Sequence, residues 1–284
     1  MTTHALQPAR RLLHSLALGL LLAGAGPALA ADYPTLSNRY GNHNVLGKEP
    51  AVRIGKAAMV RVLTHRPASK ELAASHYLLA CDGSWMTDNF AYASMASNTA
   101  DFAAIERHSI ANLPEVIEAE HHFAMQETDP SYDGPVLRTH VKRLCAEARP
   151  APPDMLVPVG SSREFTDMLL VFSMAAKPVQ VKGKRVQAWF RTTFYTQKDT
   201  VGRQPDPAVP TGEYWMTLKE VDCAKPQFRE LEKIVHSASG TQRGACPAKG
   251  AGCPMIPLKE YSMGDAERKM ACRLFGKSAA PLPL

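Results

Sequence analysis

The stretch Trp215-Met-Thr-Leu-Lys-Glu-Val-Asp-Cys223 runs from an aromatic residue into a cysteine, and a second cysteine, Cys272, follows on a short predicted helix. A weaker counterpart lies earlier in the chain, where Tyr77-Leu-Leu-Ala-Cys81 precedes Cys145. In both places a strand that ends on a cysteine is followed by a helix that carries another. The repetition indicates that one disulfide-stapled unit is used twice.

The two predicted units occupy residues 51–147 and 155–276. Each contains an apolar strand that follows a Gly-Lys turn, at Gly55-Lys56 in the first unit and at Gly183-Lys184 in the second. Turn residues between apolar runs are typical of antiparallel strands. The sequence therefore predicts an α+β fold of two tandem units, each a small antiparallel β-sheet with a C-terminal helix tethered by a disulfide.

Capping residues mark the two terminal helices. Asp133 is a good N-cap, and Pro135 falls in the first turn, where proline is tolerated. The second helix follows Ser262-Met-Gly-Asp265, which resembles a capping box, and Gly276 is placed to end it. A further helix is predicted within the first unit, from Asp101 to Met125.

The second unit shows the more regular pattern of strands. Short apolar runs bounded by turn residues predict an antiparallel meander of about six strands. The predicted strands cover residues 155–159, 168–172, 179–181, 186–193, 213–223 and 228–236, with a tight turn at Lys182-Gly-Lys-Arg185 and a long loop from Gln197 to Pro210.

Residues 1–30 are predicted to be a secretory signal peptide. Arg10-Arg11 precede an apolar run from Leu12 to Leu22, and Ala28-Leu-Ala30 before Ala31 fits a small-residue cleavage pattern. That run is shorter than the roughly 20 residues that span a bilayer, and no later run is both long and apolar enough. We expect an exported protein, periplasmic or secreted to the cell surface, without a transmembrane segment.

The segments outside the two units are short. Residues 31–50 are rich in Asn, Gly and Pro and predict an extended lead-in, and residues 277–284 form a tail. Residues 148–154, Ala-Arg-Pro-Ala-Pro-Pro-Asp, predict a stiff linker because their prolines cannot continue a helix. A chain of this length accommodates two domains, each with its own core.

All six cysteines follow the predicted signal peptide, and in an exported chain they are expected to form disulfides. Six cysteines allow 15 pairings, and their spacing alone does not choose among these. If each repeated unit closes on itself, Cys81 pairs with Cys145 and Cys223 with Cys272, which leaves Cys246 with Cys253. The Cys-x2-Cys spacing of structural zinc sites is missing.

The formal charge of the chain is +6, and it falls to +4 when Arg10 and Arg11 are removed with the signal peptide. The remaining positive charge is spread along the chain, without a long basic run or a basic stripe interleaved with aromatic residues. Nucleic acid is therefore not indicated as a partner.

Four segments of the second unit share their order and spacing with a known family. They are Phe165-Thr-Asp-Met-Leu, Val186-Gln-Ala-Trp189, Leu218-Lys-Glu-Val-Asp-Cys223 and the predicted helix from Tyr261 to Cys272. In these segments the second unit, over about residues 155–275, resembles the surface-adhesin protein E family of exported bacterial proteins. The first unit departs from the pattern, since Ala80 stands where Asp222 precedes the cysteine, and it is interpreted as a diverged copy.

The resemblance implies a small antiparallel sheet with a terminal helix tethered by a disulfide. It also implies binding, in the named case adhesion to host extracellular proteins. The family supplies no catalytic residues to transfer. Adhesion is thus an expectation from the fold alone.

The segment with the most chemical character is Glu118-Ala-Glu-His121-His122. On a helix, Glu118 and His122 share one face and have the side chains to hold zinc or copper. No His-Glu-x-x-His pattern accompanies them, and charged residues at this spacing are ordinary on a solvated helix face. The solvated face is favoured. The alternative hypothesis is a periplasmic metal-binding protein or metal-dependent enzyme that uses His108, Glu118, His121 and His122.

Nucleophilic catalysis is not indicated. Gly160-Ser-Ser162 is the nearest approach to a Gly-x-Ser-x-Gly elbow, but the second glycine and the following helix are missing, and a surface loop is expected. Oxidised cysteines supply no thiolate for such chemistry.

Aromatic residues of the second unit are weak candidates for ligand contacts. Trp189 and Trp215 lie on two predicted strands and are able to stack on a ligand if they are exposed. Aromatic residues in a small sheet usually fill its core, which is the favoured interpretation.

Two further features are candidates for recognition. Lys182, Lys184 and Arg185 form a basic hairpin tip suited to an acidic glycan or partner, although charged tips commonly just keep a sheet edge soluble. The loop from Cys246 to Cys253 is rich in Gly and Pro, and closing it reduces the entropy lost on binding. Bracing of a long loop is the simpler interpretation there.

The sequence thus predicts an exported, non-catalytic binding or envelope-associated module, possessing no cofactor, metal or catalytic residue. A purely structural role in bracing an envelope assembly is a third hypothesis. Its partner is expected to be a protein or a glycan, in an extracellular setting if the adhesin resemblance extends to function.

Overall fold

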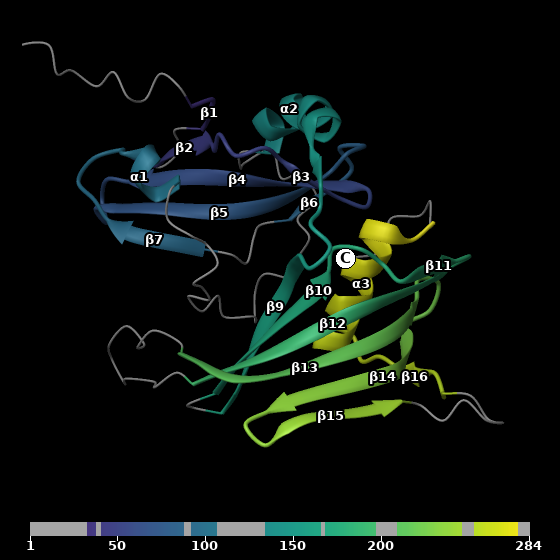
Figure 1. Ribbon diagram of the computed structural model, residues 1–284. Coiled ribbons are helices and arrows are strands. Elements are labelled where there is room, and N and C mark those ends of the chain that lie inside the picture. Colours follow the sequence, from purple (N-terminus) through teal and green to yellow (C-terminus); the bar gives the residue numbers. More distant parts are fainter. Residues whose placement is uncertain are drawn as a thin grey trace, which may run out of the picture.

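The computed structural model describes residues 33–37, 41–87, 92–106, 134–165, 168–196, 209–245 and 253–277. Two eight-stranded sheets dominate this part of the chain (Figure 1). The first sheet has the order β1-β2-β4-β3-β8, with β5 pairing to β4, β6 and β7. The second has the order β15-β14-β13-β12-β10-β9, with β11 on β12 and β16 on β14.

The first sheet is built around a long hairpin of β4 and β5. Its strands are β1 (Thr35–Ser37), β2 (His43–Leu46), β3 (Val52–Ile54), β4 (Ala57–Arg66), β5 (Glu71–Ala80), β6 (Met86–Thr87), β7 (Tyr92–Ala96) and β8 (Arg149–Pro150). The helices α1 (Phe102–Glu106) and α2 (Gly134–Glu147) pack against it. The predicted lead-in therefore contributes β1 and β2, and the predicted linker contributes β8, which pairs with β3 in parallel.

The second sheet is an antiparallel meander with two short additions. Its strands are β9 (Leu156–Phe165), β10 (Met168–Ala175), β11 (Gln180–Lys182), β12 (Arg185–Thr196), β13 (Val209–Asp222), β14 (Gln227–Ser237), β15 (Gly240–Ala245) and β16 (Ile256–Pro257). The helix α3 (Met263–Phe275) packs against β9, β10, β12, β13 and β14. The predicted turn at Lys182-Gly-Lys-Arg185 joins β11 to β12, as expected.

The ends of α3 match the predicted caps. Ser262 is the N-cap, and its hydroxyl accepts a hydrogen bond from the backbone N–H of Asp265 at 3.3 Å. At the other end the backbone N–H of Gly276 donates to the carbonyl oxygen of Cys272 at 2.8 Å. Both bonds satisfy backbone or side-chain groups that a helix terminus otherwise leaves unpaired.

Two disulfides attach helices to strands. Cys81 follows β5 and bonds to Cys145 on α2, and Cys223 follows β13 and bonds to Cys272 on α3. These are the two pairs that the duplicated cysteine pattern predicts. Cys253 is also disulfide-bonded, and its predicted partner, Cys246, lies outside the described residues.

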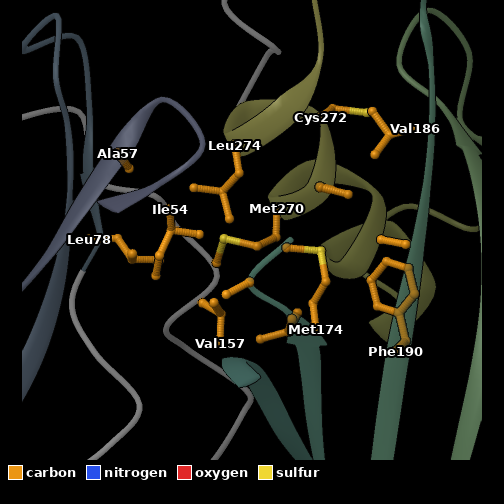
Figure 2. Packing of buried hydrophobic residues seen from close by; sticks show 14 of the residues in the cluster. Ile54, Ala57, Leu78, Val157, Met174, Val186, Phe190, Met270, Cys272 and Leu274 are labelled. Carbon is orange, nitrogen blue, oxygen red and sulfur yellow. The ribbon is translucent and has the colours of Figure 1, made fainter. Parts of the chain in front are cut away.

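The largest hydrophobic core joins the two sheets. On the second sheet Phe190 and Met174 point toward Leu274 and its neighbours on α3 (Figure 2). Ile54, Ala57 and Leu78 of the first sheet belong to the same buried cluster. The helix α3 therefore fills the space between both sheets and is not a cover for the second sheet alone.

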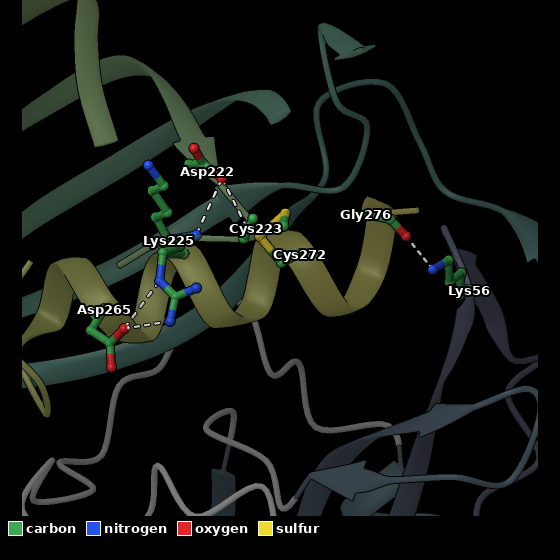
Figure 3. The surroundings of a disulfide bond; sticks show 9 residues. Lys56, Asp222, Cys223, Lys225, Asp265, Cys272 and Gly276 are labelled. Carbon is green, nitrogen blue, oxygen red and sulfur yellow. Dashed lines mark hydrogen bonds and ion pairs between the residues drawn. A yellow bond between two sulfur atoms is a disulfide. The ribbon is translucent and has the colours of Figure 1, made fainter. Parts of the chain in front are cut away.

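The turn between β3 and β4 docks on the C-terminal end of α3 (Figure 3). The backbone N–H of Lys56 donates to the carbonyl oxygen of Leu274 at 2.9 Å, and its ammonium donates to that of Gly276. Gly55 has a φ of +55°, and a Cβ atom built there lies 2.2 Å from the oxygen of Leu274. Glycine is required at this contact for both its backbone angle and its lack of a side chain.

The predicted α+β class is wrong. Strands make up 54% of the structure and helices 16%, in two sheets with a half-barrel curl. The prediction of one covering helix for each sheet fails because α3 packs into a core that both sheets share. An apolar helix face shows that a helix is buried, but it does not show against which sheet. The protein is mainly β.

Candidate ligand-binding site

The two faces of the second sheet have different environments. Side chains alternate between the faces of a strand, and Val186, Ala188 and Phe190 of β12 enter the core shared with α3. Arg185, Gln187, Trp189 and Arg191 therefore lie on the opposite face, which we call the outer face.

A polar pocket of about 540 Å³ opens on the outer face beside the turn between β11 and β12. Its lining comes from four neighbouring strands and the turns that connect them. The lining residues are Gln180, Lys182, Lys184, Arg185, Gln187, Glu220, Asp222, Ala224 and Arg229.

The register of the sheet brings these residues together in two cross-strand rows. One row contains Gln180, Gln187, Glu220 and Arg229, each directly opposite the next. The neighbouring row contains Lys182, Arg185, Asp222 and Gln227. Paired residues of antiparallel strands project from the same face, with Cβ atoms about 5 Å apart. The pocket is thus a consequence of strand pairing and does not depend on a flexible loop.

Glu220 is the buried centre of the first row, with 5% of its surface exposed. Arg185 and Arg229 form ion pairs with one carboxylate oxygen at 3.2 and 2.8 Å. The amide of Gln187 donates to the other oxygen at 2.8 Å. Burial of a charge is tolerated where it is paired and hydrogen-bonded, and here the glutamate also fixes both guanidinium groups in place.

Asp222 is held at the end of β13 by three donors. Its carboxylate accepts from the backbone N–H groups of Ala224 at 2.8 Å and Lys225 at 3.3 Å (Figure 3). It also accepts from the side-chain amide of Gln227 at 3.1 Å. Burial works to raise the pKa of Asp222, but these hydrogen bonds and nearby Arg185 outweigh it, so the pKa is lowered. The carboxylate therefore stays ionised.

Positive charge prevails in the pocket. Its lining has four cations, Lys182, Lys184, Arg185 and Arg229, and two acids, Glu220 and Asp222, which leaves an excess of two positive charges. Lys182 and Lys184 are exposed, and neither ammonium group has an ion-pair partner among the described residues. Free ammonium groups beside fixed guanidinium groups are suited to an anionic ligand such as a carboxylate, sulfate or phosphate.

The polar groups that line the pocket are ammonium, guanidinium, carboxylate and amide groups. Its lining includes no serine, cysteine or histidine as nucleophile or general base. Gly160, Ser161 and Ser162 lie within β9, so the prediction of a surface loop at these residues is wrong. In the described part of the chain, no cluster of three or more His, Cys, Asp or Glu side chains has a geometry that holds a metal ion.

The predicted metal-ligating residues His108, Glu118, His121 and His122 lie outside the described residues, as does most of the loop from Cys246 to Cys253.

Trp189 and Trp215 lie on opposite faces of the second sheet. Trp215 is 37% exposed, packs edge-on against Phe194 and has the ammonium of Lys233 at 3.9 Å from its ring centre. The two tryptophans therefore do not form one site.

The pocket contains one predicted feature and, besides it, three charged residues that no sequence pattern indicates as site residues. The basic tip of Lys182, Lys184 and Arg185 is part of it. Glu220, Asp222 and Arg229 were missed because charged residues within strands are ordinarily solvated. A clue is present, since Glu220 and Asp222 alternate with Val221, which places both acids on the face away from the core.

Comparison with known proteins identifies no family model, curated protein or solved structure that matches this chain. The resemblance to the surface-adhesin protein E family stays a prediction. Within the part of the chain that the structure describes, no helix has the length and apolar character needed to cross a membrane.

Proposed function

We propose that this protein is an exported, non-catalytic binding module that holds an acidic group of a protein or glycan partner in the polar pocket. The observation that carries this proposal is the excess of two positive charges in a pocket that is preformed by strand pairing. Arg185 and Arg229 are already ordered by Glu220 in the free protein. Little side-chain entropy is then lost when a ligand binds them.

The two lysines at the turn have a different role from the arginines. Lys182 and Lys184 are exposed and attract an anionic partner over a distance of about one Debye length, about 8 Å at physiological salt. The arginines offer planar, paired donors to a carboxylate or sulfate that reaches the pocket. Binding is therefore expected to be strongly salt-dependent, as is typical of charge-driven association.

The proposal is tested with two anionic probes, a fluorescent heparin octasaccharide and a labelled glutamate-rich peptide. The variant Lys182→Glu/Lys184→Glu is compared with Lys70→Glu/Lys142→Glu, which makes the same charge change at exposed lysines of the β4–β5 turn and of α2. We expect the pocket variant to lose about tenfold or more in affinity, equivalent to about 1.4 kcal/mol. The control variant is expected to stay within about twofold of the wild type, since isolated surface charges contribute little.

Equal losses in the two variants contradict the proposal, because they show attraction to overall charge and not to the pocket. Absence of measurable binding of both probes at low salt contradicts it as well. An adhesin-like role, in the periplasm or at the cell surface, is part of the same proposal. It depends on the expected loss of affinity in the pocket variant.

A further inference from the structure

Apolar side chains continue the outer face directly beyond the polar pocket. Trp189 is two residues after the pocket residue Gln187 on β12, and Leu218 is two residues before the pocket residue Glu220 on β13. Trp189 and Leu218 lie opposite each other. Met216 and Ile234 lie opposite each other in the next row, on β13 and β14. We call these four residues the apolar strip.

The apolar strip does not belong to the buried core of the protein. Its four side chains are half-buried, and none is a member of the three hydrophobic clusters of the described residues. They project from the face opposite α3, whose own contacts with the sheet involve Phe190 and Val186 (Figure 2). Each side chain of the strip keeps part of its surface accessible, and contiguous accessible apolar surface outside a core is suited to contact with a partner.

The far border of the strip is closed by a stacked group. The imidazole of His236 lies 4.2 Å from the ring of Tyr214, and the guanidinium of Arg191 lies 4.1 Å from that ring. The hydroxyl of Thr241 is 2.9 Å from Nδ1 of His236. These side chains contact one another. The outer face thus holds a cationic pocket, an apolar strip and a closed aromatic border. The ion pair of Glu232 and Arg243 lies beside the strip, opposite Leu218 and Ile234.

We infer that the polar pocket and the apolar strip form one docking surface for an extended protein segment that carries acidic residues followed by apolar ones. This inference rests on the proposed function and names the class of partner. Charge complementarity places the acidic residues over Lys182, Lys184, Arg185 and Arg229. The apolar residues then lie over the strip.

The composition of the strip favours a protein segment over a glycan. Leu218, Met216 and Ile234 offer aliphatic and thioether surface, which complements apolar side chains of a partner, whereas only Trp189 offers an aromatic ring for stacking a sugar. Methionine adapts to partner side chains of different shape. The rows are about 7 Å apart along the sheet, and this is the two-residue step of an extended peptide.

The inference is tested with three probes on the folded full-length mature chain. One labelled peptide has two Glu-Ser steps followed by three Leu-Ser steps, the second has serine in place of each leucine, and the third probe is the heparin octasaccharide. We expect the acidic-apolar peptide to bind about tenfold more tightly than the acidic peptide, the order of effect of a buried apolar contact. Met216→Ser/Leu218→Ser is expected to abolish this difference while keeping the affinity for the acidic peptide.

A second measurement needs no substitution. Oxidation of Met216 by hydrogen peroxide is followed by mass spectrometry with and without the acidic-apolar peptide, and Met263 at the start of α3 is the internal control. We expect saturating peptide to slow oxidation of Met216 severalfold and to leave Met263 unchanged, because a methionine covered by a partner is shielded from the oxidant.

The outcomes separate the inference from the proposed function. If both peptides and heparin bind equally and Met216 is not protected, the inference fails while the anion-binding function stands. If Lys182→Glu/Lys184→Glu leaves binding of every probe unchanged, the proposed function fails, and with it the inference. Protection of Met216 together with the lost discrimination in the strip variant supports both.

Discussion

Lys56 and Gly276 are separated by 220 positions in the sequence, and the Lys56 ammonium donates a hydrogen bond to the carbonyl oxygen of Gly276 (Figure 3). The bond joins the turn between β3 and β4 of the first sheet to the residue that ends α3. The last carbonyl groups of a helix have no partner within the helix, so a cation and a backbone N–H from another element stabilise this end. The junction between the two sheets is therefore built from specific polar contacts as well as from apolar packing.

The first prediction concerns the two turn glycines Gly55 and Gly183. Both have positive φ angles, +55° and +60°, but only Gly55 faces a close neighbour, the oxygen of Leu274. Replacement of Gly183 by alanine is expected to cost about 1–2 kcal/mol from the backbone conformation alone. Replacement of Gly55 by alanine adds a clash at the junction and is expected to cost about 3 kcal/mol or more.

Urea unfolding followed by circular dichroism gives both free energies. The Gly183→Ala variant is the matched control, because a Cβ atom there has no neighbour within 4 Å. Equal destabilisation of the two variants is incompatible with a tight contact between the β3–β4 turn and α3.

The second prediction concerns the ion pair between Lys219 on β13 and Glu267 on α3, at 2.5 Å. Glu267 is almost completely buried, and burial raises its pKa despite the opposing effect of Lys219. Lys219→Met leaves this carboxylate without its partner and is expected to cost about 3–5 kcal/mol. The double variant Lys219→Met/Glu267→Leu is expected to recover most of that loss, since well-packed apolar residues often replace a buried pair without penalty.

The comparison requires the free energy of unfolding of both single variants and the double variant. Additive effects of the two substitutions indicate that the side chains do not interact, contrary to the structure.

The third prediction compares the two disulfides. They close loops of 49 and 64 residues, for which the chain-entropy estimate is about 4 kcal/mol each. Cys223 and Cys272 are each only 4% exposed and lie in the shared core, whereas Cys81 and Cys145 are half-buried. Cys223→Ala/Cys272→Ala leaves a core cavity in addition and is expected to be the more destabilising pair of substitutions.

Thermal unfolding of the two double variants under the same conditions checks this order. A larger loss in Cys81→Ala/Cys145→Ala shows that the first sheet, and not the shared core, limits stability.

The fourth prediction concerns pH. Burial, and then the positive charge of Arg61, lower the pKa of His76 to about 4. The unfolded chain takes up a proton near pH 6.5 and the folded chain only near pH 4, so the free energy of unfolding decreases as the pH falls through this window. The decrease for this residue is at most about 3–4 kcal/mol, because each pKa unit corresponds to about 1.4 kcal/mol.

The variant His76→Gln removes this contribution, and its stability is expected to fall less steeply between pH 6.5 and 4. Part of the slope is expected to remain, because burial and His43 also lower the pKa of His65. Identical pH profiles of the variant and the wild type contradict the assigned pKa.

Local patterns in the sequence predict much of the second sheet. The apolar alternation from Val186 to Phe190 lies inside β12, the stretch before Cys223 lies inside β13, and the capping residues around Asp265 open α3. In each case the determining interaction is local or periodic. Such patterns are visible without knowledge of the partner strand.

Elements that depend on a distant partner are not predictable in this way. Arg149 and Pro150 form β8 only because β3, about a hundred residues earlier, pairs with them. The proline is compatible with this position because a short terminal strand uses few of its backbone donors. β15 contains no large apolar side chain. It forms a strand because it pairs with the edge of β14.

The binding site is predictable only in part for the same reason. The basic tip is contiguous in the sequence and is identified directly. Glu220 and Arg229 come from two further strands, and their register relative to Arg185 decides that they meet. The choice between the core face and the outer face also depends on α3, which is distant in the sequence.

The position of α3 between the sheets has a consequence for the order of folding. Residues 263–275 are synthesised after every strand that they hold together, so the shared core cannot close while the earlier strands emerge. Both sheets present uncovered apolar surface until this helix arrives, and the first sheet waits longest. Folding of the core is therefore a late, concerted event, and the nascent chain is expected to depend on protection from aggregation until α3 is made.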